Sequence, residues 1–176
     1  NQLIEEFMLL ANKRVAEYVG RKLKGKTVVY RIHDKPDPEK LSSFSYFIKR
    51  FGYEIDTDNV KGLPAAMNKL MEEVSGKKEQ NIVETLALRS MAKAVYSTDN
   101  IGHYGLAFGH YTHFTSPIRR YPDMMVHRLL TKYLEGQPAR DKDQYAKMCE
   151  HSSKMERLAT DAERASIKYK QVEFMS

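Results

Sequence analysis

Residues 102–123 read GHYGLAFGHYTHFTSPIRRYPD, and they hold the densest group of chemically distinctive side chains in the chain. Four of the six histidines fall between residues 103 and 127. Pro117 and Pro122 cannot both lie inside one helix, because proline lacks an N–H group and clashes with the preceding turn. The sequence therefore predicts a tight turn at residues 116–120 and a helix from near Pro122 to Gly136. Such a junction is a usual place for functional side chains.

Arg119 and Arg120 suit a phosphate ligand, because each planar guanidinium presents paired donors and stays charged at any working pH. The free N–H groups of the helix start would add to the same anion site. The alternative is a solvated charged patch. The histidines of this stretch are expected to be packed or hydrogen-bonded rather than metal ligands, because carboxylate partners are absent nearby. Asp123 and His127, four residues apart, are expected to pair on the helix surface.

The rest of the chain predicts a mixed α+β fold (α/β in the broad sense), predominantly helical with a few short strands. An amphipathic helix is expected from Leu3 to near Gly20 or Gly25, with Asn12 on its outer face. Its apolar face would hold Leu3, Ile4, Phe7, Met8, Ala11, Val15, Tyr18 and Val19. Residues 27–32 read as a strand. Residues 93–97 and 103–108 read as two strands that form a plausible hairpin.

Further helices are marked by proline and glycine. Asp37-Pro38 is a strong helix start and Gly52 a stop, with Phe51 on the buried face. A short extended stretch and an acidic turn at Asp56 and Asp58 follow. Other helices are expected from Pro64 to Gly76, over residues 79–91, and as one long helix from Asp141 to the end.

The composition excludes several classes of protein. The chain has 176 residues and a formal charge of +6, and its longest apolar run is far too short for a membrane span. Cys149 is its one cysteine, which excludes an intramolecular disulfide and a cysteine-based zinc cage and favours a reducing cytoplasm. Both ends lie inside helical patterns, so we expect a fragment of a longer protein.

Residues 111–128 (YTHFTSPIRRYPDMMVHR) closely resemble the signature of the catalytic (RNB) domain of the ribonuclease II superfamily, and the Arg-Arg-Tyr-Pro form is most similar to its ribonuclease R branch. Residues 102–107 (GHYGLA) fit the same block. Three further stretches agree in order and spacing: residues 4–12 (IEEFMLLAN), 30–34 (YRIHD) and 161–164 (DAER). The resemblance covers essentially the whole chain, residues 1–176, as the C-terminal part of that catalytic domain.

The resemblance implies a 3′→5′ exoribonuclease that hydrolyses single-stranded RNA to nucleoside 5′-monophosphates with two metal ions. It implies that Arg119 is the catalytic arginine that stabilises charge on the phosphate. Arg120 is expected to face structure or a neighbouring phosphate. Ser116, His113 and Tyr111 belong to the same block and are expected RNA contacts.

Two glutamates are also implied to contact RNA. Glu5 matches a residue that contacts ribose near the 3′ end, and a carboxylate that accepts from a 2′-OH favours RNA over DNA. Its alternative is an ordinary exposed helix glutamate, and Glu6 is the other possible register. Glu163 matches a position that contacts the terminal base, and its helical spacing from Tyr145 places it near the buried stripe of the last helix.

Two parts of the family pattern are expected upstream of residue 1: the carboxylates that hold magnesium (Mg2+) and a tyrosine at the scissile nucleotide. No metal ligand is therefore assigned in this chain. The implied partners are single-stranded RNA and flanking OB/cold-shock and S1 domains. The competing function is a non-catalytic RNA-binding or scaffold member of the superfamily. A third alternative is an unrelated helical interaction module.

The basic segment of residues 12–26 agrees with an RNA partner without establishing one. It holds six lysines and arginines against Glu17. It could line a backbone path, with binding that weakens steeply with salt, or form a solvated helix end.

Overall fold

The structure is a computed structural model that describes residues 1–57 and 62–175, so Asp58 of the expected acidic turn lies outside the described residues. The described residues form six α-helices and two three-residue strands, which confirms a predominantly helical α+β fold. The chain divides into two compact units. The larger unit comprises Asn1–Ile32 and Ala94–Ser176, and the smaller unit comprises His33–Lys93.

A two-stranded antiparallel sheet links the distant halves of the larger unit. Strand β1 (Tyr30–Ile32) pairs with β2 (Val95–Ser97), with Arg31 opposite Tyr96. The other edge of β1 is also used, because the Arg31 N–H donates to the Tyr111 carbonyl over 2.9 Å. The short strand predicted within residues 27–32 is confirmed.

The hairpin predicted between residues 93–97 and 103–108 is wrong. Residues Tyr104–Leu106 form a 3-10 turn, and a bridge between His103 and Phe108 closes it. Gly102 has φ +82° and a Cβ there would lie 3.0 Å from the Phe108 carbonyl, so this close approach requires glycine. The segment thus folds back on itself, while β2 pairs with a strand from much earlier in the chain.

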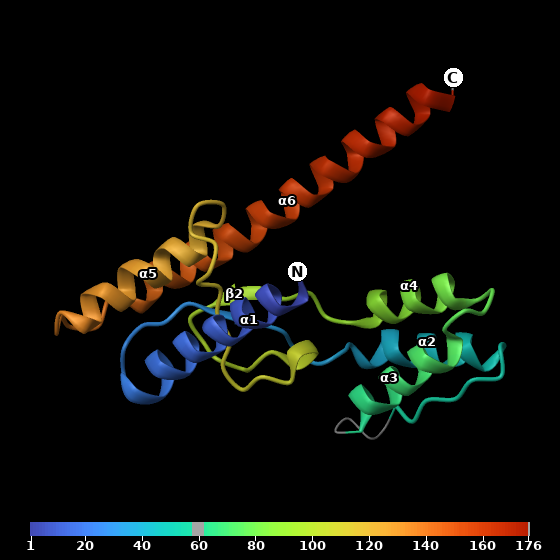
Figure 1. Cartoon of the computed structure of the whole chain (residues 1–176), viewed down its shortest axis with the longest axis horizontal. Helices are drawn as coiled ribbons and strands as arrows, with labels where there is room; N and C mark the ends of the chain where they lie inside the picture. Colours follow the sequence, from blue (N-terminus) through green and yellow to red (C-terminus); the bar gives the residue numbers. More distant parts are fainter. Residues whose placement is uncertain (58–61, 176) are drawn as a thin grey trace. The chain divides into compact units, whose positions relative to one another are not determined.

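Helices α5 (Tyr121–Leu134) and α6 (Lys142–Met175) complete the larger unit. The N-terminal part of α6 packs against β2 and α5, and Cys149 is its one fully buried residue among those described. The single long helix predicted from Asp141 is confirmed. Its C-terminal half extends away from the rest of this unit (Figure 1) and is exposed along nearly its whole length.

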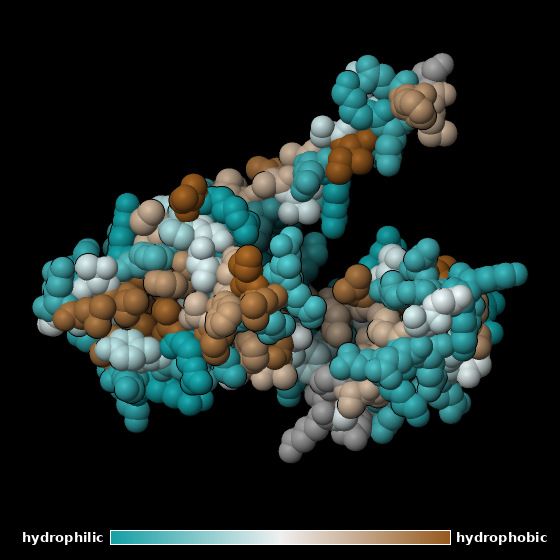
Figure 2. All heavy atoms as spheres, in the orientation of Figure 1, coloured by the Kyte–Doolittle hydropathy of each residue, from teal (hydrophilic) through white to brown (hydrophobic). Residues whose placement is uncertain are grey.

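Helix α1 (Gln2–Glu17) continues into a π-helical turn at Tyr18–Lys22. Its predicted end is confirmed, but its predicted buried face is wrong at the start, because Leu3, Ile4 and Phe7 are 70%, 63% and 62% exposed. Asn12, predicted on the outer face, is buried. Figure 2 shows hydrophobic side chains at the surface of this unit. The buried face of α1 begins only where other segments pack on it.

The smaller unit is built from α2 (Pro38–Lys49), α3 (Leu63–Val74) and α4 (Gln80–Ser90). The three predicted helices are confirmed, but Phe51 is 43% exposed. The core contains Leu41, Phe44, Ile48, Tyr53, Ile55, Leu63, Met67, Leu70, Val74, Val83 and Ala87. The Asp37 carboxylate accepts from the Glu39 N–H over 3.0 Å and so caps α2 as the sequence predicts.

Replacement of Asp37 by alanine should lower the free energy of unfolding of the smaller unit by about 0.5–2 kcal/mol, because the first turn of α2 loses its side-chain acceptor. Urea denaturation followed by circular dichroism measures this change. Asp37→Ser is the matched control and should retain most of the stability. Equal stability of the alanine and serine variants would contradict the capping role.

Candidate functional site

The 116–120 turn carries the two adjacent arginines. The N–H groups of Arg119 and Arg120 both donate to the Ser116 carbonyl, over 3.3 Å and 3.1 Å, which confirms the predicted tight turn. Ile118 at the tip is fully exposed. The Arg119 side chain is exposed and has no hydrogen bond or ion pair within residues 1–57 and 62–175. The turn therefore presents one free guanidinium.

The Arg120 side chain, in contrast, forms an ion pair within the protein. Its Nη2 donates to Asp123 Oδ1 over 2.8 Å, and the same oxygen accepts from the Ser116 N–H over 2.8 Å. Asp123 is completely buried. The predicted surface pair of Asp123 and His127 is wrong, because His127 Nε2 lies 2.8 Å from the Phe114 carbonyl oxygen and its ring stacks on that of Phe114.

A groove runs between the 116–120 turn and α6. Its volume is about 650 Å³. It brings together Arg119, Arg120 and Glu163, which the sequence predicted from two motifs more than forty residues apart. The helical spacing predicts that Glu163 lies near a buried stripe of the last helix. This prediction is wrong, because Glu163 is exposed. The other lining residues include Tyr96, Tyr121, His151, Met155, Glu156 and Thr160.

Arg31 and Glu156 connect the sheet to the wall of the groove. Arg31 Nη1 and Nη2 donate to the two carboxylate oxygens of Glu156 over 2.7 Å and 3.1 Å, in a bidentate pair. The Arg31 guanidinium also lies 4.5 Å from the centre of the Tyr96 ring. This bidentate ion pair joins β1 to α6 about two helical turns before Glu163. Arg31 lies in the YRIHD stretch, but the sequence pattern alone indicates no role for it.

His113 contacts Tyr96 of this network and is a neutral ring. The Tyr96 hydroxyl lies 2.8 Å from His113 Nδ1. Burial, with the nearby positive charges of Arg120 and Arg31, lowers the pKa of His113 to about 3. Burial raises the pKa of Tyr96 to about 12. Near neutral pH the phenol therefore keeps its proton and the imidazole stays uncharged, and the two groups share one hydrogen bond.

The remaining predicted contact residues lie apart from the groove lining. Tyr111 is buried, and its hydroxyl accepts from Asn12 Nδ2 over 3.1 Å. Ser116 is half-buried at the start of the turn, and Glu5 is exposed on the first turns of α1. The RNA roles of Tyr111, Ser116, His113 and Glu5 stay predictions.

Asn12 is a structural residue that helical periodicity does not reveal. Its Oδ1 accepts from the N–H groups of Phe114 and Thr115, over 2.9 Å and 3.2 Å. The residue sits within the IEEFMLLAN stretch, but helical periodicity alone placed it outside. A buried amide that satisfies two N–H groups of an irregular segment is a sign that its helix packs there.

Residues 1–136 match the RNB domain family. The chain belongs to this family. Over 99% of its length the RNB chain is 41% identical to ribonuclease R of Aquifex aeolicus and to ribonuclease R of Thermotoga maritima. It spans about a quarter of the length of these relatives, 25% in both cases.

Solved structures show the same fold. Mycoplasma genitalium RNase R in complex with ribose-methylated single-stranded RNA is 29% identical, with a TM-score of 0.81 over 94% of this chain and 27% of its own. Yeast Ssd1, a pseudonuclease, is 30% identical, with a TM-score of 0.72 over 85% of this chain and 19% of its own. The RNB fold thus occurs in a ribonuclease and in a pseudonuclease.

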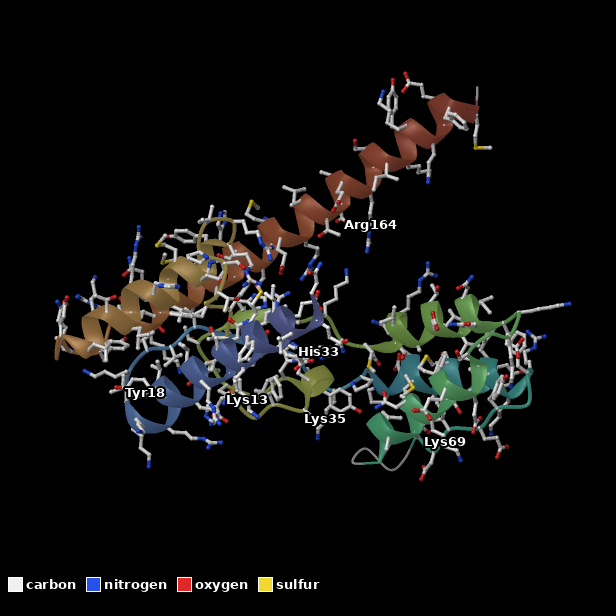
Figure 3. The ribbon with its side chains drawn as sticks, viewed as in Figure 1. Lys13, Tyr18, His33, Lys35, Lys69 and Arg164 are labelled. Atoms are coloured by element: carbon white, nitrogen blue, oxygen red, sulfur yellow. The ribbon has the colours of Figure 1, made fainter. Side chains whose placement is uncertain are left out.

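The basic segment of the RNB chain is partly paired internally. Glu17 lies 3.2 Å from Arg14 and 3.8 Å from Arg21, and Lys26 donates to the Gln137 carbonyl over 2.7 Å. Lys13 lies over the Phe108 ring at 4.6 Å. Lys13 and Tyr18 project from α1 and the turn that follows it (Figure 3). These contacts are compatible with a path for an RNA backbone and with a solvated helix end.

In the part of the chain that the structure describes, no three His, Cys, Asp or Glu side chains gather as metal ligands. The residues present in the groove thus do not form a metal cage. Among the described helices, none combines the length and the hydropathy that a transmembrane span requires.

The neutral state of His113 predicts a pH-dependent stability. In the unfolded chain His113 takes up a proton near its ordinary pKa of 6.5, whereas in the folded protein it does so only near 3. The free energy of unfolding should therefore fall as the pH is lowered through this window. His113→Gln keeps a hydrogen-bonding side chain beside Tyr96 but cannot take up a proton, so it should lose less stability between about pH 7.5 and pH 5, as measured by denaturant unfolding. Identical losses in both proteins would contradict this prediction.

Proposed function

We propose that this chain is part of a 3′→5′ exoribonuclease of the ribonuclease R type, which hydrolyses single-stranded RNA to nucleoside 5′-monophosphates. The observation that carries the proposal is the groove that joins Arg119 to Glu163. The named relatives support it, because they are ribonuclease R proteins matched over 99% of this chain. Flanking OB/cold-shock and S1 domains and a cytoplasmic location belong to the same proposal.

Arg119 is the group proposed to act on the scissile phosphate. It is exposed at the groove and uncommitted within the described residues, whereas its neighbour Arg120 is held by Asp123. An unpaired guanidinium can donate to two phosphate oxygens at once, and this interaction is strongest when negative charge develops on those oxygens. We therefore propose that Arg119 stabilises the negative charge that develops on the scissile phosphate. Arg120 is proposed to have a structural role and to lie next to a neighbouring phosphate.

The two glutamates are proposed to recognise the 3′ end. Glu163 lines the same groove as Arg119 and can accept hydrogen bonds from a terminal nucleotide. Glu5 is exposed on α1 and can accept from a ribose 2′-OH, which DNA lacks. Glu5 does not line the groove, so its proposed contact is with a different part of the RNA.

Magnesium ions are part of the proposal for the longer protein, with carboxylate ligands upstream of Asn1. When bound, such ions supply the attacking hydroxide and polarise the phosphate. The described residues form no ligand cluster, so this chain is assigned phosphate and nucleotide contacts alone.

A second candidate function is a non-catalytic RNA-binding or scaffold protein of the same family. The specific observation that favours it is the similarity to yeast Ssd1, a pseudonuclease. Release of mononucleotides from single-stranded RNA by the longer protein with magnesium would exclude this candidate.

Replacement of Arg119 by alanine in the longer protein should reduce kcat far more than RNA affinity. The expected loss of transition-state stabilisation is about 2.7–4 kcal/mol, the range found when one oxyanion-hole donor is removed. Single-turnover kinetics with a labelled oligoribonucleotide measures kcat, and a binding titration without magnesium measures Kd.

Arg128→Ala is the matched control, because Arg128 is an exposed arginine on α5 that does not line the groove. Arg128→Ala should keep the parent kcat. Equal turnover of Arg119→Ala and the parent would refute the assignment of Arg119.

The isolated chain of 176 residues should not hydrolyse RNA, because we assign the metal ligands to residues outside it. Incubation of the purified chain with single-stranded RNA and magnesium, followed by chromatography of nucleotides, tests this. Metal-dependent release of nucleoside 5′-monophosphates would overturn the assignment.

A further inference from the structure

The segment of residues 114–120 has little regular backbone pairing, yet it carries the proposed catalytic arginine. Side chains from two helices hold it. Asn12 of α1 accepts from the N–H groups of Phe114 and Thr115, and His127 of α5 contacts the Phe114 carbonyl and ring. Asp123 of α5 holds the next part, from Ser116 to Arg120.

Asp123 contacts both ends of the 116–120 turn through one oxygen. Its Oδ1 accepts from the Ser116 N–H and from Arg120 Nη2, each over 2.8 Å. The three residues between these contacts are Pro117, Ile118 and Arg119. One carboxylate oxygen therefore closes the turn from which the Arg119 guanidinium projects.

The burial of Asp123 makes this closure stiff. The side chain has no exposed surface, and a buried carboxylate is stable only with hydrogen-bonded, preferably charged, partners. Two buried atoms here lack a partner among the described residues: Asp123 Oδ2 and Arg120 Nε. If the turn moved, the carboxylate would lose its remaining partners, so any other position of the turn is costly.

We propose that Asp123 is a positioning residue that fixes the 116–120 turn and thereby holds the Arg119 guanidinium at the groove, an inference that rests on the proposed function. Asp123 does not line the groove and so acts on the reaction only through the turn. Arg120 acts as the charge partner that holds the Asp123 side chain in place.

A double-mutant cycle in the longer protein tests this inference. Asp123→Asn removes the charge opposite Arg120 with little change of shape. With Arg119 present, it should lower kcat by up to about 100-fold, the size of effect that a small misplacement of a catalytic group can have. With Arg119→Ala already in place, the same substitution should lower kcat by less than about twofold, because no guanidinium remains to be misplaced.

Equal losses of kcat in both backgrounds would overturn the inference, since a general structural defect acts whether Arg119 is present or not. Full activity of Asp123→Asn would overturn it too. Full activity of Arg119→Ala alone would instead refute the proposed function, and the inference with it. These three results are distinguishable in one set of four proteins.

Two further variants separate positioning from stability. Val74→Ala is a destabilised control, because Val74 is completely buried in the smaller unit, and it should keep the parent kcat per folded molecule. If Asp123→Asn does not fold, Asp123→Glu replaces it in the cycle, because it keeps the charge but moves it by one methylene. A loss of kcat that depends on Arg119 then supports the inference, and an equal loss with and without Arg119 overturns it.

Discussion

The Asp123 carboxylate lies in a place without solvent, and that constraint organises the region around the groove. A charge there requires donors, and the nearest ones come from the turn that immediately precedes α5. The two adjacent arginines therefore have different roles. Arg120 pairs with the buried charge, whereas the Arg119 guanidinium has no hydrogen bond or ion pair with the described residues.

The second wall of the groove depends on a different ion pair. The bidentate contact of Arg31 with Glu156 joins β1 to α6, and the Tyr96 ring packs against the same guanidinium. Because β1 pairs with β2 and its Arg31 N–H donates to the Tyr111 carbonyl, one short strand links α6 to the segment that leads to the 116–120 turn. The positions of Arg119 and Glu163 therefore depend on two ion pairs as well as on the apolar core: the buried Asp123 with Arg120, and Arg31 with the exposed Glu156.

The two units differ in charge. The smaller unit has ten basic and ten acidic side chains, whereas the rest of the chain has 19 basic and 13 acidic ones. The whole net charge of +6 thus belongs to the larger unit, which also contains the groove. A positive field around a phosphate-binding site raises the rate of encounter with RNA and weakens as salt increases.

Local signals made most helices predictable. Asp37-Pro38, Gly52, Gly76 and Pro122 act through the backbone of their own turn, so sequence alone locates them. Pairing of β1 with β2 and burial of Asn12 depend on segments about 65 to 100 residues away, which periodicity cannot detect. The motif stretches identified Arg119 and Glu163, but only the folded chain brings them to one groove.

The most direct test of the account is a structure of the longer protein with a single-stranded oligoribonucleotide in place. The account predicts that the 3′-terminal nucleotide lies in the groove, with the Arg119 guanidinium at hydrogen-bonding distance from a phosphate oxygen and Glu163 facing the terminal nucleotide. Arg120 should remain paired with Asp123. RNA bound elsewhere, with the Arg119 side chain in solvent and the groove unoccupied, would contradict it.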